Sequence, residues 1–282
     1  MKKKINRPVL RYHGGKYLLA PWIISHFPKH KIYAELFGGA DSVLMQKEIS
    51  YAEIYNDKWD TVVNVFEVLR NKQLAEQLEY QLRHTPFART EFDLCGEIDI
   101  SKIKDPVEKA RRTIFRSFAG FGSASTNNKY ATGFRANAMR SGTTPAYDWK
   151  NYANHIKSFT ERLQGVIIEK REYQQIIDNY DTKETLFYAD PPYMHSTRNM
   201  KRGNASYVHE MTDSDHIEMA EKLKKAKGMV VVSGYDTELY NQLFSGWKKF
   251  KKKWMADGAR ERIEVLWVSP NCITNKNLKL FD

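Results

Sequence analysis

Cysteine is scarce in this chain: only Cys95 and Cys272 occur among its 282 residues. They lie far apart in the sequence, and neither belongs to a pattern with metal-ligand spacing. We therefore expect a reduced, cytoplasmic compartment and no cysteine acting as a nucleophile.

Long apolar runs are absent as well, and no stretch approaches the length that crosses a bilayer. The N-terminal segment MKKKINRPVLRYHGGK is charged but has no apolar core, so we expect no signal peptide. A third absence is the pattern GxGxxG, which marks the dinucleotide loop of nicotinamide-dependent oxidoreductases. These absences favour a protein of the cell interior without a membrane partner, and they disfavour an oxidoreductase on a Rossmann sheet.

Basic residues, in contrast, are abundant. Lysine and arginine total 45 against 34 acidic residues, which gives a net charge of +11 and a pI near 9.4. Such an excess predicts a polyanionic partner, nucleic acid before an anionic membrane surface, although ordinary basic solubility gives the same numbers. Aromatic residues reach 13%, with sixteen tyrosines, and provide flat surfaces on which bases stack.

The stretch LFYADPPYMH, residues 186–195, joins an apolar strand-like run to a rigid turn. Pro191 and Pro192 remove two consecutive backbone donors and fix two φ angles, so a strand must end before them. A stiff structural turn would explain this pattern, but such a string occurs by chance in few chains of this length. We favour a rigid platform that directs the Asp190 carboxylate and the Tyr193 ring toward a flat ligand.

A glycine turn follows another short strand in ELFGGADSV, residues 35–43. The glycine pair lets backbone approach a ligand, and Asp57 follows Gly39 by 18 positions, near the spacing at which an acidic residue meets a ribose. Together with Glu35 and Asp41, Asp57 would make the rim of this site acidic. Such a rim repels a pyrophosphate and suits S-adenosylmethionine, which carries ribose hydroxyls, an ammonium group and a sulfonium.

Strand-like and helix-like segments alternate at both ends of the chain, which predicts an α/β sheet that an insertion at roughly 60–160 interrupts. We expect strands within 30–48, 51–59, 165–173, 185–193, 228–236, 247–255 and 262–270. We expect a helix directly after the glycine turn, a helical pattern over 61–83, and helices at 106–118, 174–180 and 212–228. Thr212 or Asp213 would cap the last of these helices, whose buried face would carry Ile217, Ala220 and Leu223.

The amino group of adenine is a poor nucleophile because its lone pair is delocalised into the ring. A carboxylate at Asp190 and the carbonyl oxygen of Pro191 could each accept one N–H, which would free the lone pair for a methyl group. Tyr193 would stack on the base and hold its plane. Because an amine inside a duplex is out of reach, the base would have to swing out of the stack.

Seven segments resemble those of the Dam-like DNA adenine-N6 methyltransferases of the phage and restriction-modification type: RYHGGK, ELFGGADSV, IYND, DPPY, TDSDHIEMAEKL, VVVSGYD and EVLWVSP. Their order is that of the family's α group, with the target-recognition insertion between the glycine loop and DPPY. The resemblance implies methyl transfer from S-adenosylmethionine to N6 of a flipped adenine in double-stranded DNA. It also implies an α/β fold, with a Rossmann-like methyltransferase sheet that has helices on both faces and with an inserted, mainly helical target-recognition domain. The resemblance further implies a monomer in a bacterial or phage-infected cell and no metal, and it allows a cognate endonuclease as partner.

The same resemblance assigns domains and site residues. Residues 1–59 and 161–282 would form the catalytic domain, and 60–160 the target-recognition insertion. The methyl-transfer site would consist of Asp190, Pro191, Pro192 and Tyr193. The residues expected to contact S-adenosylmethionine are Tyr12, Lys16, Phe37, Gly38, Gly39, Asp57 and Asp190. Two departures stand out: Tyr12 occupies a position that often holds tryptophan, and Asp41 replaces the last glycine of the loop.

The insertion is the expected reader of DNA. Its segment 119–145 is rich in Gly, Ser, Thr and Asn, with basic residues interleaved. The residues expected to meet phosphates or base edges are Arg116, Lys129, Arg135, Asn137 and Arg140. Family members that read GATC have a different sequence here, so no target carries over, and a solvated loop is the alternative.

Other activities stay open at this point. Methylation of cytosine N4 or of adenine in RNA would use the same platform, although a serine in place of Asp190 is the commoner form for cytosine. A catalytically inactive DNA-binding protein is a further alternative, against which the intact Asp190, Tyr193 and Lys16 argue.

Overall fold

The computed structural model describes residues 5–12, 14–120, 132–136, 142–194, 208–256 and 260–274. Its strands are β1 Ile32–Glu35, β2 Ala52–Asn56, β3 Val166–Glu169, β4 Thr185–Ala189, β5 Met229–Tyr235, β6 Lys248–Ala256 and β7 Arg260–Val268. Its α-helices are α1 Ala20–Ile24, α2 Asp60–Arg70, α3 Lys72–His84, α4 Arg89–Glu97, α5 Pro106–Ala119, α6 Pro145–Lys150, α7 Ile156–Leu163, α8 Tyr173–Tyr180, α9 Asp213–Lys224, α10 Glu238–Leu243 and α11 Pro270–Thr274. No helix within the described ranges is long and apolar enough to cross a membrane.

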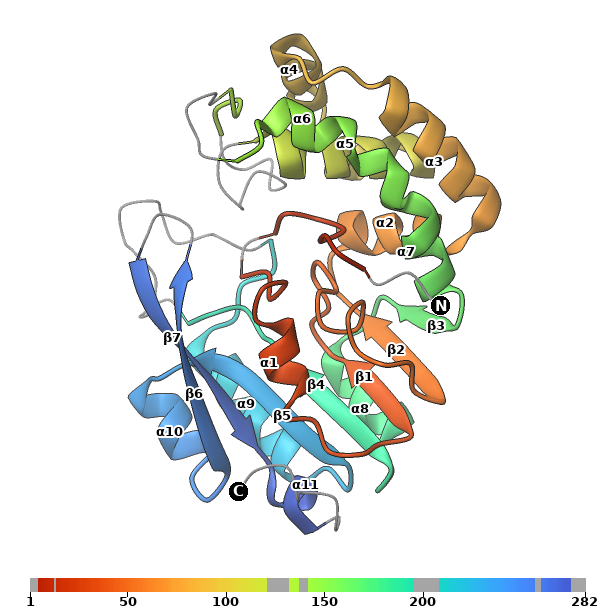
Figure 1. Ribbon diagram of the computed structural model, residues 1–282. Coiled ribbons are helices and arrows are strands. Elements are labelled where there is room, and N and C mark those ends of the chain that lie inside the picture. The colour runs from red at the N-terminus through yellow and green to blue at the C-terminus, as the bar shows by residue number, and fades with distance from the viewer. Residues whose placement is uncertain are drawn as a thin grey trace.

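Seven strands form one sheet in the order β3-β2-β1-β4-β5-β7-β6 (Figure 1). Strands β1 to β5 are parallel, whereas β7 runs antiparallel between β5 and β6. The strand order reverses between β1 and β4, and in doubly wound sheets of this kind ligands bind at the carboxyl ends of the strands beside such a switch point. The fold is therefore Rossmann-like, as predicted.

Helices cover both faces of the sheet because the side chains of each strand alternate between two apolar clusters. In β4, Phe187 belongs to the cluster that includes α8, α9 and α10, whereas Tyr188 belongs to the larger cluster that includes α1, α2 and α7. Both side chains are fully buried. The central strands are thus covered on both sides, which leaves their carboxyl ends as the accessible edge.

A helical layer, defined here as α2 to α7, lies between β2 and β3 in chain order. Helices α3 to α6 stand away from the sheet, and α2 and α7 lie between them and the strands (Figure 1). Ion pairs also join this layer to the sheet, because the carboxylate of Glu53 in β2 binds Arg162 of α7 at 2.6 Å. The division of the chain into domains at residues 59 and 160 stays a prediction.

The helical pattern over 61–83 is confirmed and consists of two helices, because Asn71 adopts an extended conformation and its side chain caps α3 by accepting from Leu74 N at 3.1 Å. Two other local predictions were wrong. Turns replace the helix expected after the glycine pair, where Asp41 has a φ of +54°. In α9, which Thr212 caps as expected, Ile217 is 39% exposed and His216 and Met219 are buried in its place.

Candidate active site

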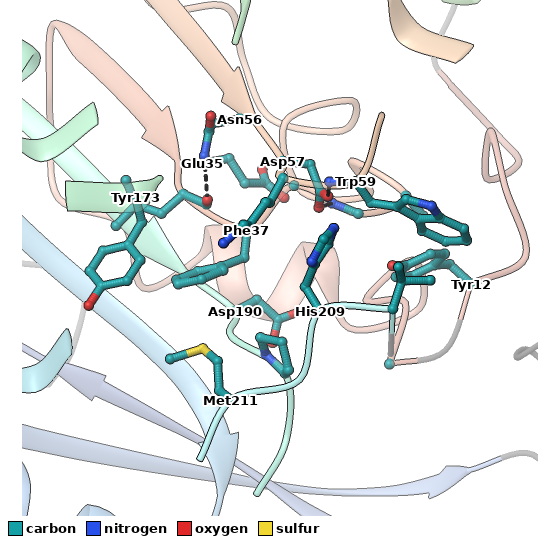
Figure 2. A pocket seen from close by; sticks show the side chains of 18 of the residues that line it. Tyr12, Glu35, Phe37, Asn56, Asp57, Trp59, Tyr173, Asp190, His209 and Met211 are labelled. Atoms are coloured by element: carbon teal, nitrogen blue, oxygen red, sulfur yellow. Dashed lines mark hydrogen bonds between the residues drawn. The ribbon is translucent and has the colours of Figure 1, made fainter. Parts of the chain in front are cut away.

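A cavity of about 230 Å³ lies at the carboxyl ends of β1, β2 and β4, beside the point where the strand order reverses. Its wall combines the N-terminal loop, the turn after β1, the residues after β2, the start of α8, the turn after β4 and the segment before α9 (Figure 2). The predicted residues that line it are Tyr12, Lys16, Phe37, Gly38, Gly39, Asp57, Asp190 and Pro192. Segments far apart in the sequence therefore meet at one site.

The turn after β1 requires glycine for steric reasons. A Cβ atom at Gly38 would lie 2.1 Å from the Tyr55 ring, and Gly39 has a φ of +49°. The Gly38 amide donates to Asn56 O at 2.7 Å, which holds the turn against the end of β2. The backbone of this turn consequently forms the cavity wall without side chains in front of it.

Asp57 and Asn56 fix the turns around the cavity. The Asp57 carboxylate accepts the Gly39 amide at 2.8 Å and the Trp59 amide at 2.7 Å. Burial raises the pKa of this carboxyl, although both amide bonds act in the opposite direction. The Asn56 side chain donates to Leu36 O at 2.9 Å and to Arg171 O at 3.1 Å, so it joins the ends of β1 and β3.

The two other carboxyl groups of the expected acidic rim are buried in the wall. Glu35 accepts from the Tyr33 hydroxyl at 2.8 Å and the Leu44 amide at 3.1 Å, and burial raises its pKa to about 8. Asp41 is 0% exposed, and its carboxyl oxygens have no hydrogen-bond partner among the described residues. Burial and the neighbouring Glu35 raise the Asp41 pKa well above its usual value.

Aromatic rings line the cavity in two pairs (Figure 2). The centroids of Phe37 and Tyr173 lie 5.3 Å apart, and those of Tyr12 and Trp59 lie 6.1 Å apart. The sequence reasoning missed Trp59 and Tyr173, although each is the last residue of a predicted strand range, where parallel strands deliver residues to one edge. It also missed His209 and Met211, which enter the cavity from the segment before α9 (Figure 2).

The platform after β4 is fixed by buried polar contacts. Asp190 Oδ1 accepts from Ser233 Oγ at 2.8 Å and forms an ion pair with Lys16 Nζ at 2.8 Å. Tyr193 stacks on Tyr235 with centroids 4.2 Å apart, and its hydroxyl accepts from Lys16 Nζ at 2.5 Å. Asp190 and Pro192 are among the residues that line the cavity, and Pro191 and Tyr193 are not.

Lys16 also faces Glu264 of β7, a residue that the sequence reasoning did not select. The distance from Lys16 Nζ to Glu264 Oε1 is 3.5 Å, and both side chains are almost fully buried. Burial alone would lower the Lys16 pKa, but Asp190 and then Glu264 outweigh it and hold this pKa well above its usual value. The sequence does contain a sign of this residue, because Glu264 is an acidic residue inside the apolar strand RIEVLWV.

Of the predicted DNA-binding residues, two lie within the described part of the chain and three lie outside it. Arg116 is 5% exposed and lies inside the helical layer, with its guanidinium carbon 5.2 Å from the Phe92 ring centroid. Arg135 is half-buried, and its amide donates to Ala119 O at 2.7 Å. Those outside the described residues are Lys129, Asn137 and Arg140.

The cavity fits the chemistry of S-adenosylmethionine. The glycine turn leaves room that a Cβ would fill, the aromatic pairs suit an adenine ring, and the unpartnered Asp41 carboxyl lies beside space that a cation can occupy. Within the part of the chain that the structure describes, no group of three or more His, Cys, Asp or Glu side chains could hold a metal ion.

Comparison with known proteins finds similarity across most of the chain. The family model for D12 class N6 adenine-specific DNA methyltransferases matches residues 12–258. The DNA adenine methylase of Salmonella typhi is 25% identical over 253 residues, which cover 86% of this chain and 85% of that protein. The Type II methyltransferase M.MjaIII of Methanocaldococcus jannaschii is 25% identical over 264 residues, covering 85% and 88% of the two chains. Among solved structures, an rRNA methylase from Streptococcus thermophilus aligns over 94% of this chain and 99% of its own, with 7% identity and a TM-score of 0.32.

Proposed function

The chain belongs to the family of D12 class N6 adenine-specific DNA methyltransferases, and from this premise we propose how its residues carry out the reaction. As a member it is an enzyme that uses S-adenosylmethionine to methylate N6 of adenine in DNA. The prediction from the DPPY and glycine segments is thereby confirmed for family, reaction and base. We propose further that the DNA is double-stranded and that the target adenine leaves the stack to reach the cavity.

S-adenosylmethionine supplies the methyl group, and we propose that the residues of the cavity hold it in place. The backbone of Gly38 and Gly39 would approach the cofactor closely, and the two aromatic pairs would flank its adenine ring. Asp57 would accept from the ribose hydroxyls, as acidic residues at this place do in nucleotide-binding sheets. Burial raises the pKa of both Glu35 and Asp41, so a ligand with positive charge would stabilise their charged forms.

The orientation of Asp190 is the observation that carries the proposed transfer chemistry. Its carboxylate stands at the end of β4 in the cavity wall, and Lys16 and Ser233 both bind Oδ1. That arrangement leaves Oδ2 to accept one N6 hydrogen of adenine, and the carbonyl oxygen of Pro191 would accept the other. Tyr193 would hold the plane of the base, with Tyr235 stacked behind its ring.

We propose that the helical layer and the segment 119–145 read the DNA. Phe134 anchors the described part of this segment, with its ring centroid 5.0 Å from that of Phe87, and Arg135 follows it. Arg135 would contact the DNA, as would Lys129, Asn137 and Arg140. Arg116 would support this surface from inside the layer, because its side chain is buried against Phe92. The net charge of +11 also favours a polyanion.

We also propose that the catalytic domain consists of residues 1–59 and 161–282, and that residues 60–160 form the target-recognition insertion. The family resemblance alone supports three further proposals: that the protein acts as a monomer, that it has a cognate endonuclease, and that it works in a bacterial or phage-infected cell.

Transfer of labelled methyl groups from S-adenosylmethionine to unmethylated genomic DNA tests the proposed function, with mass spectrometry of the nucleosides as readout. We expect N6-methyldeoxyadenosine from the wild type. Replacement Asp190→Ala should abolish transfer, because N6 loses its acceptor, while DNA affinity stays within a few fold. Asp190→Asn keeps the shape of the side chain and should also be inactive.

The matched control is Asp178→Ala, which removes an exposed carboxylate of α8 that pairs with Lys222 on the surface. It should leave the transfer rate unchanged. Methylated cytosine in the product, or full turnover by a folded Asp190→Asn variant, would contradict the proposed role of the platform.

A further inference from the structure

One buried ammonium group serves two carboxylates beside the cavity. Lys16 Nζ lies 2.8 Å from Asp190 Oδ1 and 3.5 Å from Glu264 Oε1. Glu264 is 1% exposed and comes from β7, which none of the segments assigned to the cavity includes. Burial of a carboxylate is costly unless a cation compensates it, and the cation that compensates Glu264 is the one that also pairs with Asp190.

Glu264 is also tied to the ring that would hold the base. In the register of β5 and β7 it lies opposite Tyr235, on which Tyr193 stacks. The Tyr193 hydroxyl lies 3.4 Å from both carboxylate oxygens of Glu264. Lys16, Asp190, Tyr193 and Glu264 therefore form one connected cluster, which we call the buried relay.

The surroundings keep Glu264 sensitive to protonation near neutral pH. The charged and titratable side chains that face it are Lys16 from the N-terminal loop, Asp190 and Tyr193 from the turn after β4, Tyr235 from β5, and Lys252, its partner in the register of β6 and β7. Burial raises the pKa of Glu264 to about 7, and Lys16 partly offsets the effect. The carboxylate is therefore charged above neutral pH and protonated below it.

We propose that Glu264 is a positioning residue of the methyl-transfer site, which shares the Lys16 ammonium with Asp190 and accepts, through Lys16, the proton that adenine N6 loses. The inference rests on the proposed function. If Lys16 paired with Asp190 alone, the cation at Oδ1 would draw charge from the whole carboxylate, and Oδ2 would be a weaker acceptor for N6. A second carboxylate on Lys16 leaves Asp190 the stronger acceptor.

The protons and electrons of this step balance within the cluster. The lone pair of N6 forms the bond to the methyl carbon, while the carbon–sulfur bond breaks and its electron pair stays on sulfur. The methylated nitrogen passes its extra proton to Asp190, Lys16 takes that proton as it gives one of its own to Glu264, and Asp190 becomes a carboxylate again. The relay thus ends with Glu264 protonated and both Lys16 and Asp190 charged as before.

Single-turnover methyl transfer on bound DNA, measured between about pH 5.5 and 8.5, tests the inference. The wild-type rate should rise as the pH passes through about 7, because Glu264 becomes charged there. In Glu264→Gln the rate should fall at least about tenfold and lose this inflection, because an amide accepts no proton. Affinities for S-adenosylmethionine and DNA should stay within about threefold, since Glu264 is not among the residues that line the cavity.

Two further variants keep the test decisive. Glu264→Asp retains a carboxylate one methylene farther from Lys16, so it should transfer slowly and keep a pH inflection. Glu53→Gln is the matched control, because Glu53 is another buried acid, 2.6 Å from Lys47, and lies outside the cavity wall. It should lower the melting temperature without removing the inflection.

The outcomes separate this inference from the proposed function. No methylation of adenine by the wild type would overturn the function. Normal wild-type transfer with the same rate and pH profile in Glu264→Gln would overturn only the role of Glu264. Loss of the inflection in Glu53→Gln would also overturn that role, because the inflection would then depend on the stability of the protein. Its loss in Glu264→Asp would do the same, because the inflection would then depend on the shape of the side chain at this position.

Discussion

Replacement of Asp41 by glycine should stabilise the protein. Asp41 has a φ of +54°, a left-handed conformation that costs a residue with a Cβ roughly 1 kcal/mol. Its buried carboxyl lacks a hydrogen-bond partner among the described residues, which adds about 1–3 kcal/mol. Glycine removes both penalties but gives back about 0.5–1 kcal/mol through the greater entropy of the unfolded chain. We expect a net gain of about 2 kcal/mol, or roughly 4–8 °C in melting temperature.

The gain should also depend on pH. Because burial and Glu35 raise the Asp41 pKa in the folded state, the folded protein holds a proton that the unfolded chain has released. The free energy of unfolding of the wild type must therefore fall as the pH rises from the ordinary carboxyl pKa toward the raised one. Asp41→Gly lacks this proton, so its advantage over the wild type should be larger at pH 8 than at pH 5.

Thermal unfolding without cofactor at both pH values is the assay, and Asp41→Asn is its matched control. Asparagine keeps a Cβ in the left-handed conformation but cannot ionise, so it should remove the part of the pH dependence that Asp41 contributes and recover less of the stability. A glycine variant that unfolds below the wild type at pH 8 would refute the reasoning. So would a gain that is equal at the two pH values.

Two substitutions in the cavity wall should weaken cofactor binding to different extents. Gly38→Ala should lower the melting temperature and abolish cofactor binding in calorimetry, because its Cβ would stand 2.1 Å from the buried Tyr55 ring. Binding at wild-type strength would contradict the packing described. Tyr173→Ala should weaken S-adenosylmethionine binding by about tenfold, because the ring beside Phe37 is lost. DNA affinity, measured by fluorescence anisotropy, should change little. An equal loss of both affinities would point to unfolding of the region.

The sequence was most informative at the ends of the parallel strands. Asp190 and the glycine pair could be predicted to meet because a proline pair and a glycine turn each end a short apolar run, and parallel strands deliver such ends to one edge. Helix boundaries were harder to predict. The apolar spacing over 61–83 continues through Asn71, and only the extended backbone of that residue separates α2 from α3.

The chemical surroundings of Asp190 required tertiary structure. Lys16 was expected to contact the cofactor, and it does line the cavity, yet its ammonium binds Asp190 and the Tyr193 hydroxyl. That contact depends on a loop 174 residues before Asp190 and on the antiparallel register of β7, which brings Glu264 to the same point. Neither can be derived from local pattern, because register and loop path are set by the packing of the whole sheet. Since one cation joins the cofactor cavity to the transfer platform, a change in charge at either place must alter the electrostatics of the other.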